Sequence, residues 1–252
     1  MTLKNFYDNH KNFACRNLLE YKLSPGIKCK FDLIWDKLGR QEDFFNALDL
    51  GCSGNSILHI FNKSKHNSYL DLALKPLGHY KTKKKSHPIC GDLANLPYRS
   101  NTFDLVSALD VLEHIADDEK AIKEIKRVMK EDGISVISVP HRKKKFTQQD
   151  NLIGHFRRYE VTDLKESCRR NGMKLLKVFG VYGLIMKISV IQARYPDKTE
   201  ENLIRLRDLY IKSVSFRVFW TLIVKLISKL MKVEAKYQSI KNIMNIGVII
   251  KK

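Results

Sequence analysis

The segment ALDLGCSGN, residues 47–55, carries the clearest chemical signal in this sequence. Asp49 lies at the end of an apolar run that is typical of a buried strand, and Gly51 and Gly54 form a turn before a segment that begins like a helix. Glycine lets a backbone approach a ligand closely, and the N–H groups of a helix N-terminus bind anions. The stretch GCSGNS lacks the second glycine of the dinucleotide fingerprint GxGxxG. The segment therefore predicts a binding loop for a ligand without a pyrophosphate.

Two further acids follow at positions where strands are expected to end. Asp71 lies 20 residues after Gly51 and could accept hydrogen bonds from ribose hydroxyls. Asp92 lies in CGDLANLPY, where its carboxylate could accept a hydrogen bond from an adenine amine while Leu93 packs on the ring. Each acid alone is equally compatible with a turn or a helix cap. In combination with the loop, they favour a ligand that contains a nucleoside.

Two histidine-containing segments could supply acid–base chemistry. Glu113 and His114 are adjacent beyond an expected strand, with a structural role at a helix start as the alternative. His155 lies in GHFRRY, residues 154–159, and its ordinary pKa is near neutral. The arginines of this segment could bind phosphate or carboxylate in a bidentate manner. The alternative is that His155 and Tyr159 bind the loop backbone while the arginines are solvated.

Strands and helices alternate along most of the chain. Strands are expected at residues 45–50, 68–73, 87–92, 103–109, 134–139, 173–179 and 246–250. Helices are expected from Pro25 to Gly39, from Ser56 onward, from Asp117 or Asp118 to Gly133, and from Thr162 to Gly172. This alternation predicts a parallel, doubly wound α/β sheet.

Four segments together resemble the class I S-adenosylmethionine (SAM)-dependent methyltransferases, particularly the type 11 group. They are ALDLGCSGN, YLDLA, GDLANLPYRSNTFDLVSALDVLEHI and AIKEIKRVMKEDGISVISVP. The resemblance covers residues 44–140 closely and 141–180 loosely. It implies a seven-stranded Rossmann-like sheet with N-terminal helices and a helical insertion before the last strand. The implied divisions are a helical lead-in (1–44), a SAM-binding core (45–186), the insertion (187–243) and the last strand (244–252).

The resemblance also implies a set of donor-binding residues. Asp49, Gly51, Ser53, Gly54 and Asn55 would line the methionine end of SAM, Asp71 and Leu72 the ribose, Asp92 and Leu93 the adenine, and Ala108 and Leu109 the region of the sulfonium. Family members usually have glycine where this chain has Ser53 and Asn55. Asparagine tolerates positive φ, whereas Ser53 adds a side chain beside the donor.

The GHFRRY segment resembles a GHxRxY/F element that follows the fifth strand in methyltransferases of glycan, lipid and quinone pathways. This likeness implies that His155, Arg157, Arg158 and Tyr159 lie near the acceptor, with His155 as the candidate catalytic residue. The implied reaction is an in-line displacement at the sulfonium methyl, which releases S-adenosylhomocysteine. We expect a small-molecule, glycan or lipid-linked acceptor, methylated at oxygen. A non-catalytic SAM-binding protein is a further alternative.

Charge is concentrated in the second half of the chain. Of the formal charge of +19, residues 141–252 contribute +16, from 25 basic and 9 acidic residues. This balance suggests an anionic partner, such as RNA, an anionic membrane surface or a phosphorylated substrate. RNA methylation is the main alternative function, although no NPPY-type motif and no RRM or KH signature occurs.

The cysteines, at positions 15, 29, 52, 90 and 168, form no CxxC pair. This pattern argues against a zinc site and a disulfide framework, so we expect no metal and a cytoplasmic location. No run of 18 apolar residues predicts a membrane-spanning helix.

Residues 211–236 predict a basic amphipathic helix. Lys225, Lys229, Lys232 and Lys236 recur at steps of four, three and four, apart from the apolar positions. Such a helix could lie peripherally on an anionic inner membrane face, or it could pack on the sheet or on a second subunit of a homodimer.

Overall fold

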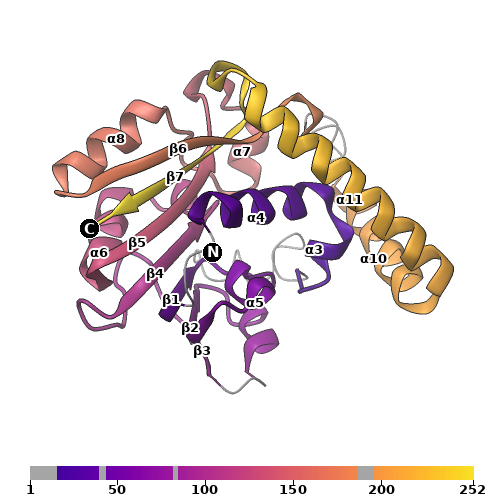
Figure 1. Ribbon diagram of the computed structural model, residues 1–252, viewed down its shortest axis with the longest axis horizontal. Coiled ribbons are helices and arrows are strands. Elements are labelled where there is room, and N and C mark those ends of the chain that lie inside the picture. The colour runs from indigo at the N-terminus through magenta and orange to yellow at the C-terminus, as the bar shows by residue number, and fades with distance from the viewer. Residues whose placement is uncertain (1–15, 40–43, 82–84, 187–195) are drawn as a thin grey trace.

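A computed structural model describes residues 16–39, 44–81, 85–186 and 196–252 of the chain (Figure 1). One seven-stranded sheet runs through the described residues in the order β3-β2-β1-β4-β5-β7-β6. The strands are β1 (Phe44–Leu50), β2 (Ser64–Asp71), β3 (Ser86–Cys90), β4 (Phe103–Leu109), β5 (Met129–Pro140), β6 (Lys174–Tyr182) and β7 (Asn245–Lys251). The predicted doubly wound α/β class is confirmed, and each of the seven expected strands is present.

The last strand departs from the predicted parallel arrangement. Strands β1 to β5 pair in parallel, whereas β7 pairs antiparallel with both β5 and β6. Asn245, the first residue of β7, pairs with Tyr182 at the end of β6 and with Pro140 at the end of β5. The insertion thus leaves and re-enters the sheet at the same edge, which forces β7 to run in the opposite direction.

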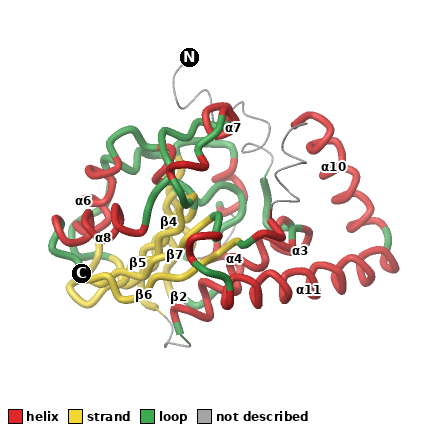
Figure 2. The backbone as a smooth tube through the Cα atoms, turned by 90° about the horizontal axis from the view of Figure 1, so that it is seen from above, coloured by secondary structure: helices red, strands yellow, loops and turns green. Residues whose placement is uncertain are grey.

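Helices cover both faces of the sheet (Figures 1 and 2). The longer helices are α4 (Pro25–Leu38), α6 (Asp118–Val128), α8 (Val161–Arg170), α10 (Pro196–Lys212) and α11 (Val214–Tyr237). The shorter ones are α3 (Glu20–Leu23), α5 (Ile57–Phe61), α7 (Gln148–Leu152) and the 3₁₀ turns η1 (Pro76–Tyr80), η2 (Leu112–His114), η3 (Lys143–Lys145), η4 (Leu184–Met186) and η5 (Ile240–Asn242). The apolar residues of α6 and α8 share one core cluster, and those of α4, α5 and α11 share the other.

Two predicted helix boundaries are wrong. Helix α6 ends at Val128 rather than at Gly133, because Met129 is extended and pairs with Phe103 as the first residue of β5. Helix α8 is capped by Glu160 rather than by Thr162. Glu160 and Asp163 form a reciprocal capping box, which satisfies backbone N–H groups at the start of the helix. A residue that looks like a cap in sequence is thus displaced when a neighbour makes the better hydrogen-bond pair.

The insertion holds the N-terminal helices against the sheet. The indole Nε1 of Trp220 in α11 donates to the carbonyl of Leu23, and Lys232 forms an ion pair of 2.6 Å with Asp36 of α4. None of the helices that the structure describes combines the length and apolar character that crossing a bilayer requires. The division of the chain at residues 44, 186 and 243 stays a prediction, and residues 1–15, 40–43 and 187–195 lie outside the described residues.

Candidate active site

The glycine loop and the second acid meet at the carboxyl edge of the sheet. The loop follows β1, and the backbone N–H of Ser53 donates to Asp71 Oδ2 over 2.8 Å. The backbone N–H of Ala73 donates to the other oxygen, Oδ1, over 2.9 Å. Neighbouring parallel strands end side by side, so segments 18 residues apart in sequence are joined here by a direct bond. Asp71 thus lies beside the glycine loop, where its oxygens accept backbone N–H groups, and its contact with ribose hydroxyls stays a prediction.

Asp49 lies beneath the loop, buried at the end of β1. Its two oxygens accept hydrogen bonds of 2.5 Å, one from Ser56 Oγ and one from Ser107 Oγ. Burial raises the pKa of Asp49 to about 6, although the two hydroxyl groups favour the ionised form. The carboxyl group therefore changes its charge close to neutral pH.

The two glycines of the loop face protein rather than open space. Gly51 has a φ of +62°, and a Cβ at this position would lie 2.5 Å from Cγ2 of Val111. A Cβ on Gly54 would collide with the backbone oxygen of Arg16. Glycine at 51 is thus required by the left-handed backbone and by close packing of the segment that follows β4, which the sequence did not indicate.

Ser53 and Asn55 occupy the positions where the family usually has glycine. Ser53 has a φ of +47°, so its backbone keeps the conformation that favours glycine, whereas Asn55 does not have a positive φ. Ser53 Oγ and Asn55 Oδ1 are buried and have no hydrogen-bond partner among the described residues. Buried polar atoms of this kind are rare in native proteins unless a ligand or water satisfies them.

The remaining predicted donor residues differ in exposure. Asp92 is exposed and accepts a hydrogen bond of 2.9 Å from the N–H of Ala94, whereas Leu93 is buried in the core. Leu72 and Leu109 are partly buried, and Ala108 is fully buried. All five lie at or just beyond strand ends at the same edge as the loop, and their contact with a donor stays a prediction.

One part of the site was missed by the sequence analysis. Asp110 follows β4 with a φ of +53°, and its carboxylate binds Lys30 Nζ at 2.6 Å. Ser138 Oγ and Asn245 Nδ2 donate to its other oxygen over 2.8 Å each. Burial opposes ionisation, but the charge of Lys30 and these bonds outweigh it, so the pKa of Asp110 lies below its ordinary value. The sequence does show that Asp110 directly follows an expected strand. Its partners lie far away in sequence, so no local pattern indicated the ion pair.

The arginines of GHFRRY are held within the protein. Arg158 makes a bidentate pair with buried Asp150, with both N–O distances at 2.9 Å. Arg157 pairs with Asp118 and donates to the carbonyl of Ala116. The hydroxyl of Tyr159 donates to Asp118 over 2.7 Å. Each of these side chains thus binds a carboxylate of the protein, with Arg157 partly exposed, and their contact with an acceptor stays a prediction.

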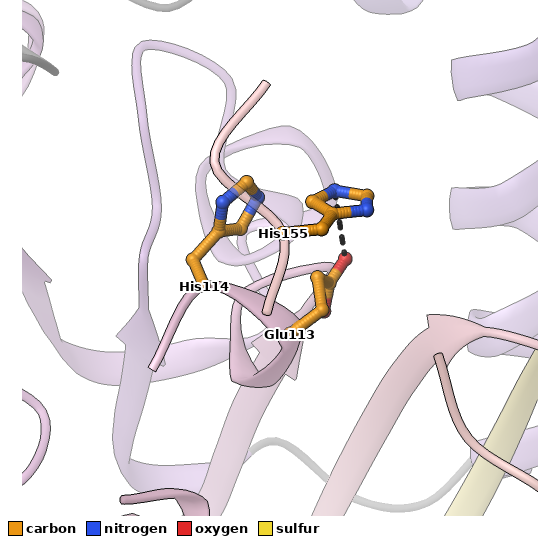
Figure 3. A group of neighbouring side chains, drawn as sticks. All are labelled: Glu113, His114 and His155. Atoms are coloured by element: carbon orange, nitrogen blue, oxygen red, sulfur yellow. Dashed lines mark ion pairs between the residues drawn. The ribbon is translucent and has the colours of Figure 1, made fainter. Parts of the chain in front are cut away.

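His155 meets Glu113 and His114 beside the end of β4 (Figure 3). The N–H of Phe156 donates to the carbonyl of Glu113 over 2.8 Å, which fastens the GHFRRY segment to turn η2. His155 Nδ1 lies 3.0 Å from an oxygen of Asp150, and its Nε2 lies 3.9 Å from Glu113 Oε1. The sequence had assigned Glu113 and His114 separately from His155.

Burial shifts the pKa values of Glu113 and His114 in opposite directions. Burial, followed by the charge of Asp110, raises the pKa of Glu113 well above its ordinary value. Burial and the nearby His155 lower the pKa of His114 to about 3, although the carbonyl of Gly154 favours the protonated ring. At a pH below the pKa of Glu113 and above that of His114, the Glu113 carboxyl group and the His114 imidazole are therefore both neutral.

The residues that build this site match a known domain family. Residues 48–137 match the model of the methyltransferase domain, type 11. Residues 48–137 thus carry a methyltransferase domain of the class I SAM-dependent type. In this methyltransferase the matched segment runs from β1 into β5, and thus includes the glycine loop, Asp71, Asp92 and Glu113.

Individual relatives share parts of this sequence or its fold. An uncharacterized protein of Methanocaldococcus jannaschii is 29% identical over 192 residues, which cover 74% of this chain and 82% of that protein. Demethylmenaquinone methyltransferase of Lactobacillus johnsonii is 37% identical over 87 residues, 34% of each chain. The structure of Haemonchus contortus phosphoethanolamine N-methyltransferase 2 with SAM has a TM-score of 0.66 at 17% identity, over 100% of this chain and 60% of that one.

The similarity has a clear limit. Four further curated relatives are matched over only 18–36% of their own length. The shared part is the donor-binding domain, so SAM is the methyl donor of this enzyme. The relatives do not indicate which acceptor this chain methylates. The loop fits this donor, because Ser53 Oγ and Asn55 Oδ1 are buried and lack partners within the described part of the chain, beside an acid that already binds the loop.

Titration of Asp49 should make SAM binding depend on pH. SAM carries a positive sulfonium and amine, so we expect ionised Asp49 to favour its binding. With a pKa of about 6, about nine-tenths of Asp49 is protonated at pH 5. SAM affinity measured by calorimetry should therefore fall about tenfold between pH 8 and pH 5.

The variant Asp49→Asn should lose this pH dependence, whereas Asp132→Asn should keep it, because Asp132 is exposed at the opposite end of β5. Equal pH profiles for the parent and Asp49→Asn would contradict the assignment.

Proposed function

We propose that this enzyme transfers a methyl group from SAM to a small-molecule, glycan or lipid-linked acceptor, at an oxygen atom. One observation carries the proposal. The segment after β4 touches both halves of the site: Val111 packs on Gly51 of the glycine loop, and the carbonyl of Glu113 accepts the N–H of Phe156 in GHFRRY. A donor on the loop and an acceptor beside His155 would thus be separated by one short turn.

The donor half of the proposal uses the residues that end β1 to β4. We assign the methionine end of SAM to Ser53 and Asn55, the ribose to Asp71, and the adenine to Asp92 with Leu93. SAM supplies a methyl group that is already activated on a sulfonium. Alignment and exclusion of water then provide much of the rate acceleration, so few catalytic groups are needed.

The acceptor half depends on His155. Because Asp150 is an ionised carboxylate opposite Nδ1, this nitrogen carries the ring proton and Nε2 carries the lone pair. Arg158 occupies the same carboxylate in a bidentate manner and so fixes its orientation. His155 Nε2 is therefore prepared to accept the proton that an acceptor hydroxyl loses as its oxygen gains the methyl group.

The donor assignment predicts a graded set of SAM affinities. Asp71→Ala should weaken binding by about 1.5–3 kcal/mol, through loss of charge-assisted hydrogen bonds to the ribose. Ser53→Ala should weaken binding by about 0.5–1.5 kcal/mol, because it removes the hydroxyl that has no partner among the described residues and that we assign to the donor. Asp132→Ala, which removes the same charge at the opposite edge of the sheet, should leave the affinity unchanged. If Asp71→Ala binds SAM as the parent does, the ribose assignment is wrong.

The acceptor assignment predicts a separation of binding from transfer. His155→Ala should keep SAM affinity within about twofold and lower methyl transfer by roughly 10²–10⁴-fold, the usual contribution of a general base. Transfer of tritium from labelled SAM into organic-soluble extract measures this loss, and labelled RNA would instead support RNA methylation. Normal turnover together with a large loss of SAM affinity would contradict the role of His155.

Helix α11 adds a second surface to the proposal. Its 24 residues span about 36 Å, and the structure divides their apolar side chains between two opposite faces. The inner face packs on the protein with Trp220, Val224 and Met231. The outer face consists of residues that are 48–75% exposed: Val214, Val218, Phe219, Leu222, Leu226, Leu230, Val233 and Tyr237.

An anionic membrane surface fits the outer face. An apolar stripe of this length is unusual on a soluble monomer. Lys225, Lys229 and Lys236 are exposed along one flank of the stripe, whereas Lys232 is engaged by Asp36. A helix with an apolar face and flanking lysines can lie in the headgroup region of a bilayer. We therefore propose that α11 brings the acceptor site to a lipid-linked substrate at the inner membrane face.

Flotation with liposomes tests the membrane proposal. The protein should float with vesicles of phosphatidylcholine and phosphatidylserine at low salt, and less so as salt increases. Changing Lys225, Lys229 and Lys236 to Gln should weaken binding by roughly two orders of magnitude, at about 1 kcal/mol per lysine. The matched variant with Lys120, Lys123 and Lys165 changed to Gln should float as the parent does. If the parent stays at the bottom with anionic vesicles and sediments as a dimer, the outer face is a subunit interface.

A further inference from the structure

The cluster of Glu113, His114 and His155 contains three potential metal ligands from two distant segments. Each residue offers one ligand atom, and these atoms lie within 4.8 Å of one another (Figure 3). Glu113 is fully buried, and neither of its oxygens has a hydrogen-bond partner in the part of the chain that the structure describes. A buried carboxyl group without partners is costly, and a cation in contact with it is one of the few arrangements that remove this cost.

Both imidazoles have their other nitrogen occupied in the manner of metal ligands. His155 Nδ1 lies 3.0 Å from the carboxylate of Asp150, and His114 Nδ1 lies 3.2 Å from the carbonyl of Gly154. Each Nδ1 therefore donates to its partner, which leaves Nε2 as the nitrogen that can bind an ion. Histidines that bind metals usually donate their second nitrogen to a carboxylate or a backbone carbonyl, because this fixes the ring and increases its basicity.

The spacing of the cluster suits a small divalent ion. Zinc binds nitrogen and oxygen at about 2.0–2.2 Å, so two ligands of a tetrahedral site lie about 3.4 Å apart. His155 Nε2 and Glu113 Oε1 are 3.9 Å apart, which is too long for a hydrogen bond and requires only a small contraction around an ion. Two histidines and one glutamate also form the ligand set of catalytic zinc sites that keep a fourth position open.

We propose that Glu113, His114 and His155 bind one divalent transition-metal ion, with zinc as the probe. Their place beside the turn that packs on Gly51 puts the ion between the glycine loop and GHFRRY. A metal with an open position lowers the pKa of a bound hydroxyl group, so the bound ion would activate an acceptor oxygen in place of His155 Nε2, whose lone pair the ion then occupies. This use of the ion rests on the proposed function, whereas the binding site itself does not.

Calorimetry of the full chain, purified in the presence of a chelator that is then removed, tests the site. Titration with zinc alone should show one equivalent of tight binding, and metal analysis after desalting should recover one zinc per chain. Glu113→Gln and His155→Ala should lower zinc affinity at least a hundredfold, and Asp150→Asn, which alters the support of His155, by 10–100-fold. Cobalt should give the visible absorption of a tetrahedral site in the parent and lose it in Glu113→Gln.

Two controls separate this site from adventitious binding and from misfolding. His66 and His87 form a histidine pair with ring centroids 6.2 Å apart on the other side of β1, and changing both to Ala should leave one equivalent of zinc bound. Each variant should keep the parent's circular dichroism and its SAM affinity within about twofold. A parent that binds less than one zinc, or binding that survives in both Glu113→Gln and His155→Ala, overturns the proposal. If the protein binds one zinc but does not bind SAM at all, the metal site stands and the proposed function is wrong.

Discussion

The ion pair between Lys30 and Asp110 joins four elements at the functional edge of the sheet. Asp110 follows β4, Lys30 comes from α4, and the other hydrogen bonds of the carboxylate come from β5 and β7. Partly buried charges are stable only when they are paired and hydrogen-bonded, so these elements are restricted to one arrangement. Residues 111–114 then leave the sheet in a defined direction, with Val111 on the glycine loop and Glu113 at His155. Both halves of the candidate site depend on the path of this short segment.

Acids at the edge of the sheet illustrate how environment decides charge. Asp49 is buried with only hydroxyl donors, so its pKa rises to about 6. Asp110 has a lysine in contact and stays ionised. The side-chain oxygens of Glu113 have no hydrogen-bond partner among the described residues, and the more distant charge of Lys30 does not offset burial, so the pKa of Glu113 lies well above its ordinary value. Desolvation acts on all three, and the nearest donor or cation determines the outcome.

Helix α11 shows why periodicity alone does not describe a surface. Its apolar residues follow helical spacing on both sides, and one face is used to hold α3, α4 and β6. The other face remains exposed over the length of the helix, next to a flank of lysines. A helix that packs on its own protein can thus still present an apolar surface to a partner. Packing and membrane contact, which are alternatives in the sequence, are compatible in the structure.

The sequence by itself determined the sheet, the order of its elements and the glycine loop. These features depend on local signals: the period of apolar residues, glycine turns, and acids at the ends of strands such as Asp71. The strand Phe103–Leu109 was predicted with the observed limits, because a continuous apolar run between turns is unambiguous. Helix ends were less accurate, since the cap at Glu160 depends on the reciprocal bond to Asp163.

Only the tertiary structure decided which distant side chains meet. Lys30 and Asp110 are 80 residues apart, and Glu113 and His155 are 42 apart, so no local pattern relates them. Likewise, the cysteine pattern predicted no metal, whereas the histidine and glutamate cluster forms only after GHFRRY is fastened to turn η2. The antiparallel direction of β7 follows from where the insertion re-enters the sheet. Local sequence patterns determine which neighbouring residues can pair. Residues far apart in sequence pair only when the strands and helices pack against one another.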